Sequence, residues 1–329
     1  MNTMVRNHRL DLLRVIALTM IILMHSPMPD CASGFLLSGI SYFTSPGIGL
    51  FFMISGSLLL GNSLSTKDFL KNRFSKILYP TLFWTILYLI IKFSNEHMGI
   101  KSLLISACSI PFSAQGHGVL WFMYTLAGLY LLTPILSKWL NNACKREIEF
   151  YLLLWAITLI YPYLSKFLII NDSDTGILYY FTGYLGYYLL GYYLKNHYKY
   201  RIIHVVLAIA VATIVPVTLC FSAMERDFYT MLWYLSLPVV LMAFCWFVLI
   251  NRCPNKKIVI INEVSKLSFG IYLIHIFIMR NILWRISVIT ELPGVMQIPV
   301  VLILTFLLSF IAVWMLSKLT LSKYIIGVE

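Results

Sequence analysis

The stretch RVIALTMIILMH, residues 14–25, decides the fold class, because it is almost wholly apolar yet carries an ionisable side chain at each end. A helix needs about 20 apolar residues to cross the hydrocarbon core of a bilayer. The apolar run extends over residues 10–28, which is long enough to span. Because Arg14 lies inside the run and no small-residue cleavage pattern follows it, we interpret the segment as a retained first span and not as a signal peptide.

The composition of the whole chain points the same way. Of its 329 residues, 60% are hydrophobic and only 12% are charged, whereas soluble domains carry about 25% charged residues. Apolar stretches long enough to span, or nearly so, cover residues 10–28, 46–61, 77–95, 118–138, 149–170, 177–194, 202–222, 229–250, 267–289 and 295–317. We therefore predict an all-α, polytopic integral membrane protein with about ten transmembrane helices in one bundle.

The remaining sequence shows no linker, low-complexity tract or internal repeat, so residues 1–329 are predicted to form a single transmembrane domain. Residues 96–117, which lie between the third and fourth predicted spans, are too rich in serine and proline to cross a membrane. This segment is typical of a re-entrant or amphipathic element at the outer face.

The net charge of +12 would suggest a nucleic-acid partner in a soluble chain. Here the basic residues lie mainly in alternate connections, and an excess of Lys and Arg marks the cytoplasmic side of a membrane protein. The connections that this rule places inside contain Arg6, Arg9, Lys67, Lys71, Arg73, Lys76, Lys138, Lys145, Arg146, Lys195, Lys199, Arg201, Arg252, Lys256, Lys257, Lys266, Lys318 and Lys323. Both termini are therefore predicted to be cytoplasmic, and no nucleic-acid partner is expected.

The six cysteines include no C-x-x-C pair, which argues against a zinc or redox site, and we predict no metal. Cys31 and Cys108 fall in connections predicted to lie outside, where a disulfide can form.

The two ionisable groups of the first span share one face of a helix. Eleven residues separate Arg14 from His25, so the side chains project within about 20° of each other and about 16 Å apart along the axis. Asp11 precedes Arg14 by three residues, the spacing at which opposite charges meet. This polar stripe is predicted to face the bundle interior. Either Arg14 pairs with Asp11 at the inner interface and His25 lies at the outer one, or the stripe lines a reaction site in which His25 accepts a proton.

Five segments, in order along the chain, resemble the membrane acyltransferase 3 family. The first combines an arginine and a histidine separated by ten residues, and the others resemble the family's FF-x-x-SG, R-x-x-R, W-F…Y…P and late-chain patterns. The segments are LDLLRVIALTMIILMH (10–25), GLFFMISGSLLLG (49–61), FLKNRFSKILYP (69–80), HGVLWFMYTLAGLYLLTP (117–134) and SFGIYLIH (268–275).

The resemblance implies an O-acetyltransferase of the bacterial plasma membrane, which moves an acetyl group from acetyl-CoA to a hydroxyl of a cell-surface polysaccharide or its lipid-linked precursor. It assigns His25 and Arg14 to catalysis, with His25 as general base, and we count Asp11 with them because its spacing pairs it with Arg14. Arg73 and Lys76 become candidates for binding acetyl-CoA. From the residues alone, that basic segment is equally typical of topology determination or contact with anionic lipids.

The resemblance is to short members of the family without an attached extracytoplasmic hydrolase-like domain, among them the O-acetyltransferases of enterobacterial common antigen. Two departures matter. Lys76 stands where the pattern has a second arginine, which keeps the charge but loses the planar guanidinium that grips phosphate in two places. Leu126 stands where the long, domain-fused members carry a glutamate, which removes one candidate acid.

Further candidates for substrate binding are His117, Trp121 and Ser55. His117 and Trp121 are typical of membrane-interface anchors, or they contact the acceptor sugar. Ser55 either allows close helix contact among small residues or accepts the acyl group, which would need an adjacent base. His275 is interpreted as a buried structural histidine or as a second base.

The tyrosine- and glycine-rich segment 179–195 predicts close helix packing, with a hydroxyl-lined acceptor path as the alternative. A transporter or flippase for a glycan or small metabolite is the rival function, because it would also bury ionisable residues in a cavity. Such folds often contain inverted repeats, and no matched halves are found here. The acceptor sugar, the acylated position, acetyl versus succinyl, and the oligomeric state stay open.

Overall fold

The computed structural model describes residues 6–29, 31–96, 99–110, 112, 120–164, 176–199, 201–221 and 231–327, and its regular elements are all helical. In chain order they are α1 (His8–His25), α2 (Gly34–Thr44), α3 (Pro46–Leu59), α4 (Thr66–Phe69), the π-helical turn η1 (Leu70–Phe74), α5 (Ser75–Glu96), α6 (Ile100–Ser109), α7 (Trp121–Leu140), α8 (Lys145–Thr158), α9 (Tyr161–Leu164), the 3-10 turn η2 (Tyr179–Phe181), α10 (Leu185–Asn196), α11 (Ile202–Phe221), α13 (Leu237–Arg252), α14 (Val259–Asn281), the 3-10 turn η3 (Leu283–Arg285), α15 (Ser287–Thr290), α16 (Gly294–Leu316) and α17 (Ser322–Ile325).

Six helical segments within the described residues are long and apolar enough to cross a membrane. They cover Gly34–Leu59, Thr66–Ser94, Lys145–Leu164, Ile202–Leu219, Val259–Arg285 and Gly294–Leu316. The helices α1, α7, α10 and α13 occupy the other predicted ranges, but they are shorter or more polar. The all-α prediction is confirmed, and the count of ten spans stays a prediction.

Several predicted boundaries are wrong by more than a turn. The second helical segment begins at Gly34 and not at residue 46, because α2 continues into α3 through Ser45. Pro46 occupies the first turn of α3, where a missing N–H removes no helical hydrogen bond. The predicted span 177–194 is only in part a helix, since η2 and a turn precede the 12-residue α10. Residues 100–109 form the short helix α6, in agreement with a segment that does not span.

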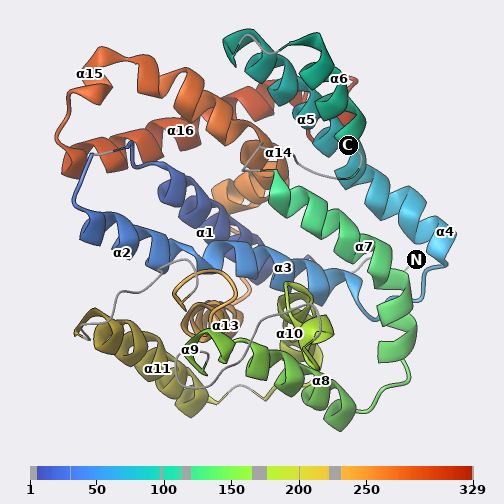
Figure 1. Cartoon of the computed structure of the whole chain (residues 1–329). Coiled ribbons are helices and arrows are strands. Elements are labelled where there is room, and N and C mark those ends of the chain that lie inside the picture. The colour runs from blue at the N-terminus through green and yellow to red at the C-terminus, as the bar shows by residue number, and fades with distance from the viewer. Residues whose placement is uncertain are drawn as a thin grey trace.

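Helix α1 lies in the middle of the molecule. It packs against α3, α13, α14 and α16 (Figure 1). Figure 1 shows α16, α5 and α6 on one side of this centre, and α8, α10, α11 and α13 on the other. Most of the core is apolar, with Leu13, Leu18 and Ile22 of α1 fully buried, and most of the polar side chains buried among them are hydroxyls of Ser and Thr.

Basic connections that are far apart in the sequence meet at one end of the bundle. The backbone N–H of His8 donates to Asn255 Oδ1 over 2.9 Å, and Gly327 lies against the carbonyl oxygen of Lys76. At the opposite end, Met28 lies 2.6 Å from Gln297 Nε2. The cytoplasmic location of the termini stays a prediction. Cys31 and Cys108 are free thiols, so the disulfide considered between them is not formed.

Helices α3 and α10 touch backbone to backbone, which agrees with the close packing predicted for both segments. A Cβ atom added at Gly56 would lie 1.9 Å from the carbonyl oxygen of Tyr188, and one added at Gly191 would lie 2.0 Å from that of Met53. Only glycine fits at these two positions.

Gly56→Ala is therefore expected to destabilise the protein by about 1–3 kcal/mol, because the added methyl group forces α3 and α10 apart. Gly128→Ala is the matched control, since an added Cβ meets no atom within 4 Å there. Thermal unfolding of both variants in detergent measures the difference. Equal unfolding temperatures would mean that the two helices separate without cost.

Candidate functional site

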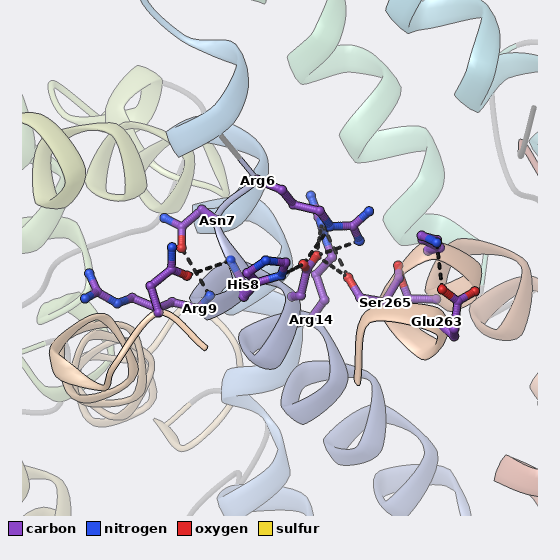
Figure 2. Close-up of polar contacts among 11 residues, drawn as sticks. Arg6, Asn7, His8, Arg9, Arg14, Glu263 and Ser265 are labelled. Carbon is purple, nitrogen blue, oxygen red and sulfur yellow. Dashed lines mark hydrogen bonds and ion pairs between the residues drawn. The ribbon is translucent and has the colours of Figure 1, made fainter. Parts of the chain in front are cut away.

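A buried carboxylate organises the end of α1 that carries the basic residues. Asp11 is only 2% exposed and accepts hydrogen bonds from three side chains. Arg6 donates through Nε to Oδ2 over 2.8 Å and through Nη2 to Oδ1 over 3.0 Å. Arg14 Nη1 and Ser265 Oγ donate to Oδ1 over 3.2 Å and 2.8 Å. Figure 2 shows Arg6 and Arg14 from the N-terminal part of the chain pointing toward the same place as Ser265 of α14. The predicted Asp11–Arg14 pair is thus present, and Ser265 joins it from α14.

Arg14 also faces a second group of polar residues. The Tyr130 hydroxyl lies within the range of polar interaction with Ser55, and Arg14 and Arg73 both interact electrostatically with this phenol. Within the described residues, the hydrogen bonds of Arg14 all use Nη1. Its Nε and Nη2 therefore keep N–H groups for a ligand. Tyr130 and Ser55 connect the Asp11 cluster to the basic segment around Arg73.

Ser55, the serine nucleophile considered from the sequence, does not lie beside His25. Gly47 of α3 packs against Ala17 and Met20 of α1. Ser55 lies eight residues further, which is about 12 Å along α3 and at the level of Arg14. His25 lies beyond Met20 in the opposite direction. Since a serine nucleophile needs an adjacent base, the geometry gives Ser55 no support in that role.

His25 lies beside a second histidine at the other end of α1. The ring centroids of His25 and His275 are 5.7 Å apart. His275 is fully buried, and its Nδ1–H donates to the carbonyl oxygen of Tyr272 over 2.5 Å. This bond assigns the proton to Nδ1 and leaves Nε2 as an acceptor, and Nε2 has no hydrogen-bond partner among the described residues. Arg280 interacts electrostatically with both rings.

The Asp11 cluster and the histidine pair both connect α1 with α14, and we call these two contacts rungs. Ser265 meets Asp11 and Arg14 at one rung, and His275 meets His25 at the other. Ten residues of α14 and eleven residues of α1 separate the rungs, so the two helices run in parallel with matching rise. The polar stripe of α1 thus faces α14.

An aromatic cluster of Trp121, Phe122, Tyr184, Tyr234 and Tyr272 lies next to the histidine pair. Trp121 is 5.1 Å from Tyr184 and 5.5 Å from Tyr234, measured between ring centroids. Phe122 is 5.3 Å from Tyr272, which is 5.5 Å from His275. The Tyr234 hydroxyl lies 3.2 Å from the Sδ atom of Met24, so the cluster reaches the end of α1 that carries His25. His117 lies outside the described residues.

A cationic cavity of about 580 Å³ lies at the other end of the bundle. One side of the cavity is formed by η1 and the start of α5, and the other side by the C-terminal helix α17. Its lining residues are Leu64, Lys71, Asn72, Arg73, Ser75, Lys76, Tyr79, Lys323 and Tyr324, with four cations and no carboxylate among them. A π-helical turn ends at Phe74, between Arg73 and Lys76, and both residues line the cavity.

Two other cavities lie away from His25. One, of about 360 Å³, is lined mainly by aromatic and aliphatic side chains of α7, α8 and α10, including Trp139 and Trp155. The other, of about 220 Å³, lies beside His8 and Cys253. Among the described residues, no group of three His, Cys, Asp or Glu side chains is placed to hold a metal ion.

An all-helical chain with several apolar spans, a buried charge cluster and a histidine pair defines a membrane-embedded protein with the polar interior of an enzyme or a carrier. The family comparison decides between these classes. The model of the acyltransferase domain matches residues 7–314. The chain therefore belongs to the membrane acyltransferase 3 family and is a multi-pass membrane acyltransferase. No curated protein and no solved structure matches it.

Four residues meet the predicted site residues without having been assigned to the site from the sequence. Tyr130 belongs to the quoted family pattern but was given no role, and His275 was left open between a structural histidine and a second base. Ser265 and Lys323 carried no signal for a role in a site beyond their hydroxyl or charge. All four meet the predicted residues only through tertiary packing.

Proposed function

We propose that the protein is an integral O-acyltransferase of the bacterial plasma membrane. It moves an acetyl group from acetyl-CoA to a hydroxyl of a cell-surface polysaccharide or its lipid-linked precursor. The observation that supports this best is the pairing of a cationic cavity at one end of the bundle with a histidine pair at the other. Such a molecule can hold a charged donor at one membrane face and activate an acceptor at the other.

The cationic cavity supplies the chemistry that the donor needs. Coenzyme A carries a diphosphate, and Arg73 and Lys76 project into one cavity together. An arginine can bind a phosphate through two N–H groups, and a lysine acts as a point charge. Beyond the cavity, Arg73 leads to Tyr130 and Arg14, so the thioester arm would enter between α3, α7 and α1. No metal takes part in this proposal.

His25 acts as the general base. Its imidazole withdraws the proton of the acceptor hydroxyl as that oxygen attacks the thioester carbonyl. The tetrahedral intermediate then collapses with cleavage of the carbon–sulfur bond, and the imidazolium returns its proton to the leaving thiolate. The Nε2 acceptor of His275 can take a hydrogen bond from His25, which would leave the other nitrogen of His25 to act as base. His275 is thus a positioning residue.

Arg14 and Asp11 act at the contact with Ser265, which lies at the end of α1 nearer to the cationic cavity. About 16 Å along α1 is too far for direct cooperation between Arg14 and His25, so the donor's flexible arm must bridge the distance. Asp11 and Ser265 hold Nη1 of Arg14, and its remaining N–H groups are directed to the donor. Asp11 is therefore a positioning residue that acts through Arg14.

The aromatic cluster beside His275 is the proposed acceptor site. Sugar rings pack their C–H faces against aromatic side chains, and the half-buried Trp121, which lies on Tyr234, offers such a surface. Membrane lipids would surround the bundle and hold a lipid-linked acceptor at the level of the aromatic cluster.

The proposal is tested with purified protein in lipid nanodiscs, labelled acetyl-CoA and a glycan extract. Transfer of label to the glycan is expected, and mass spectrometry of surface glycans from cells with and without the protein identifies the product. Movement of unmodified glycan across vesicles without transfer of label would contradict the proposal and indicate a carrier.

Arg73→Ala is expected to raise the KM for acetyl-CoA by about tenfold to a hundredfold, because a charge-assisted hydrogen bond contributes about 1.5–3 kcal/mol. Lys67→Ala is the matched control, since Lys67 lies in the adjacent helix α4 and does not line the cavity. Initial rates at varied acetyl-CoA concentration separate the two variants. An equal KM in both would remove Arg73 from the donor site.

A further inference from the structure

The C-terminal helix α17 is built into the wall of the cationic cavity. It lies beyond residue 314, where the match to the family model ends. Trp84 Nε1 donates to the carbonyl oxygen of Ile325 over 2.9 Å, and Ile326 is fully buried. Gly327 follows with a φ of 68°, close to the carbonyl oxygen of Lys76. These contacts fix α17 against α5, so Lys323 and Tyr324 are parts of a defined site.

Aromatic rings and a fourth cation meet at this corner of the cavity. Tyr79 and Tyr324 lie edge to face, with ring centroids 5.4 Å apart. Their side chains are 48% and 41% exposed, so each keeps open ring surface. Lys323 Nζ lies 4.8 Å from the centroid of the Tyr324 ring, which holds the ammonium group at the cavity wall.

We propose that this corner binds the 3′-phosphoadenosine end of the donor. The adenine packs against Tyr79 and Tyr324, and Lys323 binds the 3′-phosphate. This inference rests on the proposed function, because it names the part of coenzyme A that α17 recognises. Lys323 would thus determine donor specificity, and Tyr79 and Tyr324 would supply the rings on which the adenine stacks, beside Arg73 and Lys76.

The chemistry of the corner fits this ligand. A nucleobase such as adenine stacks on aromatic side chains through its π-face. The described residues that line the cavity include four cations and no carboxylate, so a phosphate there is attracted from several directions. The cavity of about 580 Å³ is also within the range of small-molecule sites. A phospholipid head group shares the phosphate but not the base.

The test compares acetyl-CoA with 3′-dephospho-acetyl-CoA as donors, using the full-length protein in nanodiscs. The wild type is expected to use acetyl-CoA with a kcat/KM about tenfold higher or more, from one charge-assisted hydrogen bond to the extra phosphate. Lys323→Ala should bring this ratio close to one, and Lys323→Arg should restore it. Lys318→Ala is the matched control, because Lys318 also contacts an aromatic ring, Trp314, but lies outside the cavity.

The tyrosines are tested in the same assay. Tyr324→Leu is expected to raise the KM for acetyl-CoA about tenfold, and Tyr324→Phe, which keeps the ring, should stay near the wild-type value. An unchanged donor ratio in Lys323→Ala, while the wild type transfers acetyl, would overturn the role of α17 and leave the proposed function intact.

A direct binding measurement separates the two proposals if the wild type transfers nothing. The probe is 3′,5′-ADP, titrated into protein in nanodiscs of zwitterionic lipid and in nanodiscs that contain phosphatidylglycerol. Binding that Lys323→Ala weakens about tenfold would keep the nucleotide site and reject acyl transfer. Absence of nucleotide binding together with enrichment of phosphatidylglycerol at the cavity would identify a lipid site and overturn the inference.

Discussion

Replacing His25 with alanine is expected to lower acetyl transfer by about 10²- to 10⁴-fold, which is the usual contribution of a general base. Alanine cannot accept the proton of the acceptor hydroxyl. It is also a strong helix former, so α1 should stay intact and the protein should still enter the membrane. Initial rates of label transfer measure the loss, and the amount of protein purified from membranes measures folding.

His204→Ala is the matched control for this result. His204 is an exposed histidine whose Nδ1 lies 2.6 Å from the Tyr198 hydroxyl, and its replacement should leave the rate unchanged. His275→Gln tests the partner ring, with a lower kcat and a shifted pH profile of kcat as the expected outcome. If His25→Ala modified glycan at the parental rate, the base would have to be another group.

Asp11→Ala is expected to have the second large effect, because it removes the shared acceptor of Arg6, Arg14 and Ser265. Breaking a buried ion pair costs about 3–5 kcal/mol. The side chains of Arg6 and Arg14 are 40% and 28% exposed, so solvent screening reduces the expected loss to about 2–3 kcal/mol. Because Arg14 also loses its fixed orientation, kcat/KM should fall together with stability.

Glu263→Ala provides the matched control for Asp11. Glu263 accepts a hydrogen bond from Lys266 over 2.6 Å near the same end of α14, but the two side chains are 49% and 44% exposed. Exposed ion pairs contribute about 0–1 kcal/mol, so this variant should unfold near the wild-type temperature. Asp11→Asn should fall between the two, since it keeps the shape and loses the charge. Equal stability of Asp11→Ala and Glu263→Ala would show that the cluster is not a structural centre.

The fold class and the polar stripe of α1 were predictable from the sequence. Apolar length and a scarcity of charge indicate membrane helices, and the 3.6-residue period places Asp11, Arg14 and His25 on one face. The partners of that stripe were not predictable. Ser265 is 254 residues from Asp11 in the chain, and helical period alone does not determine which helix faces which.

Helix ends and local turns also escaped sequence reasoning. Propensity does not show that α2 continues into α3 through Ser45, because the Ser-Pro pair is equally typical of a break. The π-helical turn Leu70–Phe74 has no signature that distinguishes it from ordinary helix. Lys323 was assigned only to topology, since its distance along the chain from Arg73 hides their meeting at one cavity.

The parallel alignment of α1 and α14 constrains how the bundle can move. Both rungs join the same two rods, so sliding one rod past the other by a single turn, about 5.4 Å, would break the Asp11–Ser265 contact and separate the two imidazoles in the same movement. Such sliding cannot break the contact at one end of the two helices without breaking the contact at the other end. Helices α1 and α14 are therefore expected to move as one rigid unit. An opening of the protein to either substrate has to come from movements of the helices that surround this pair.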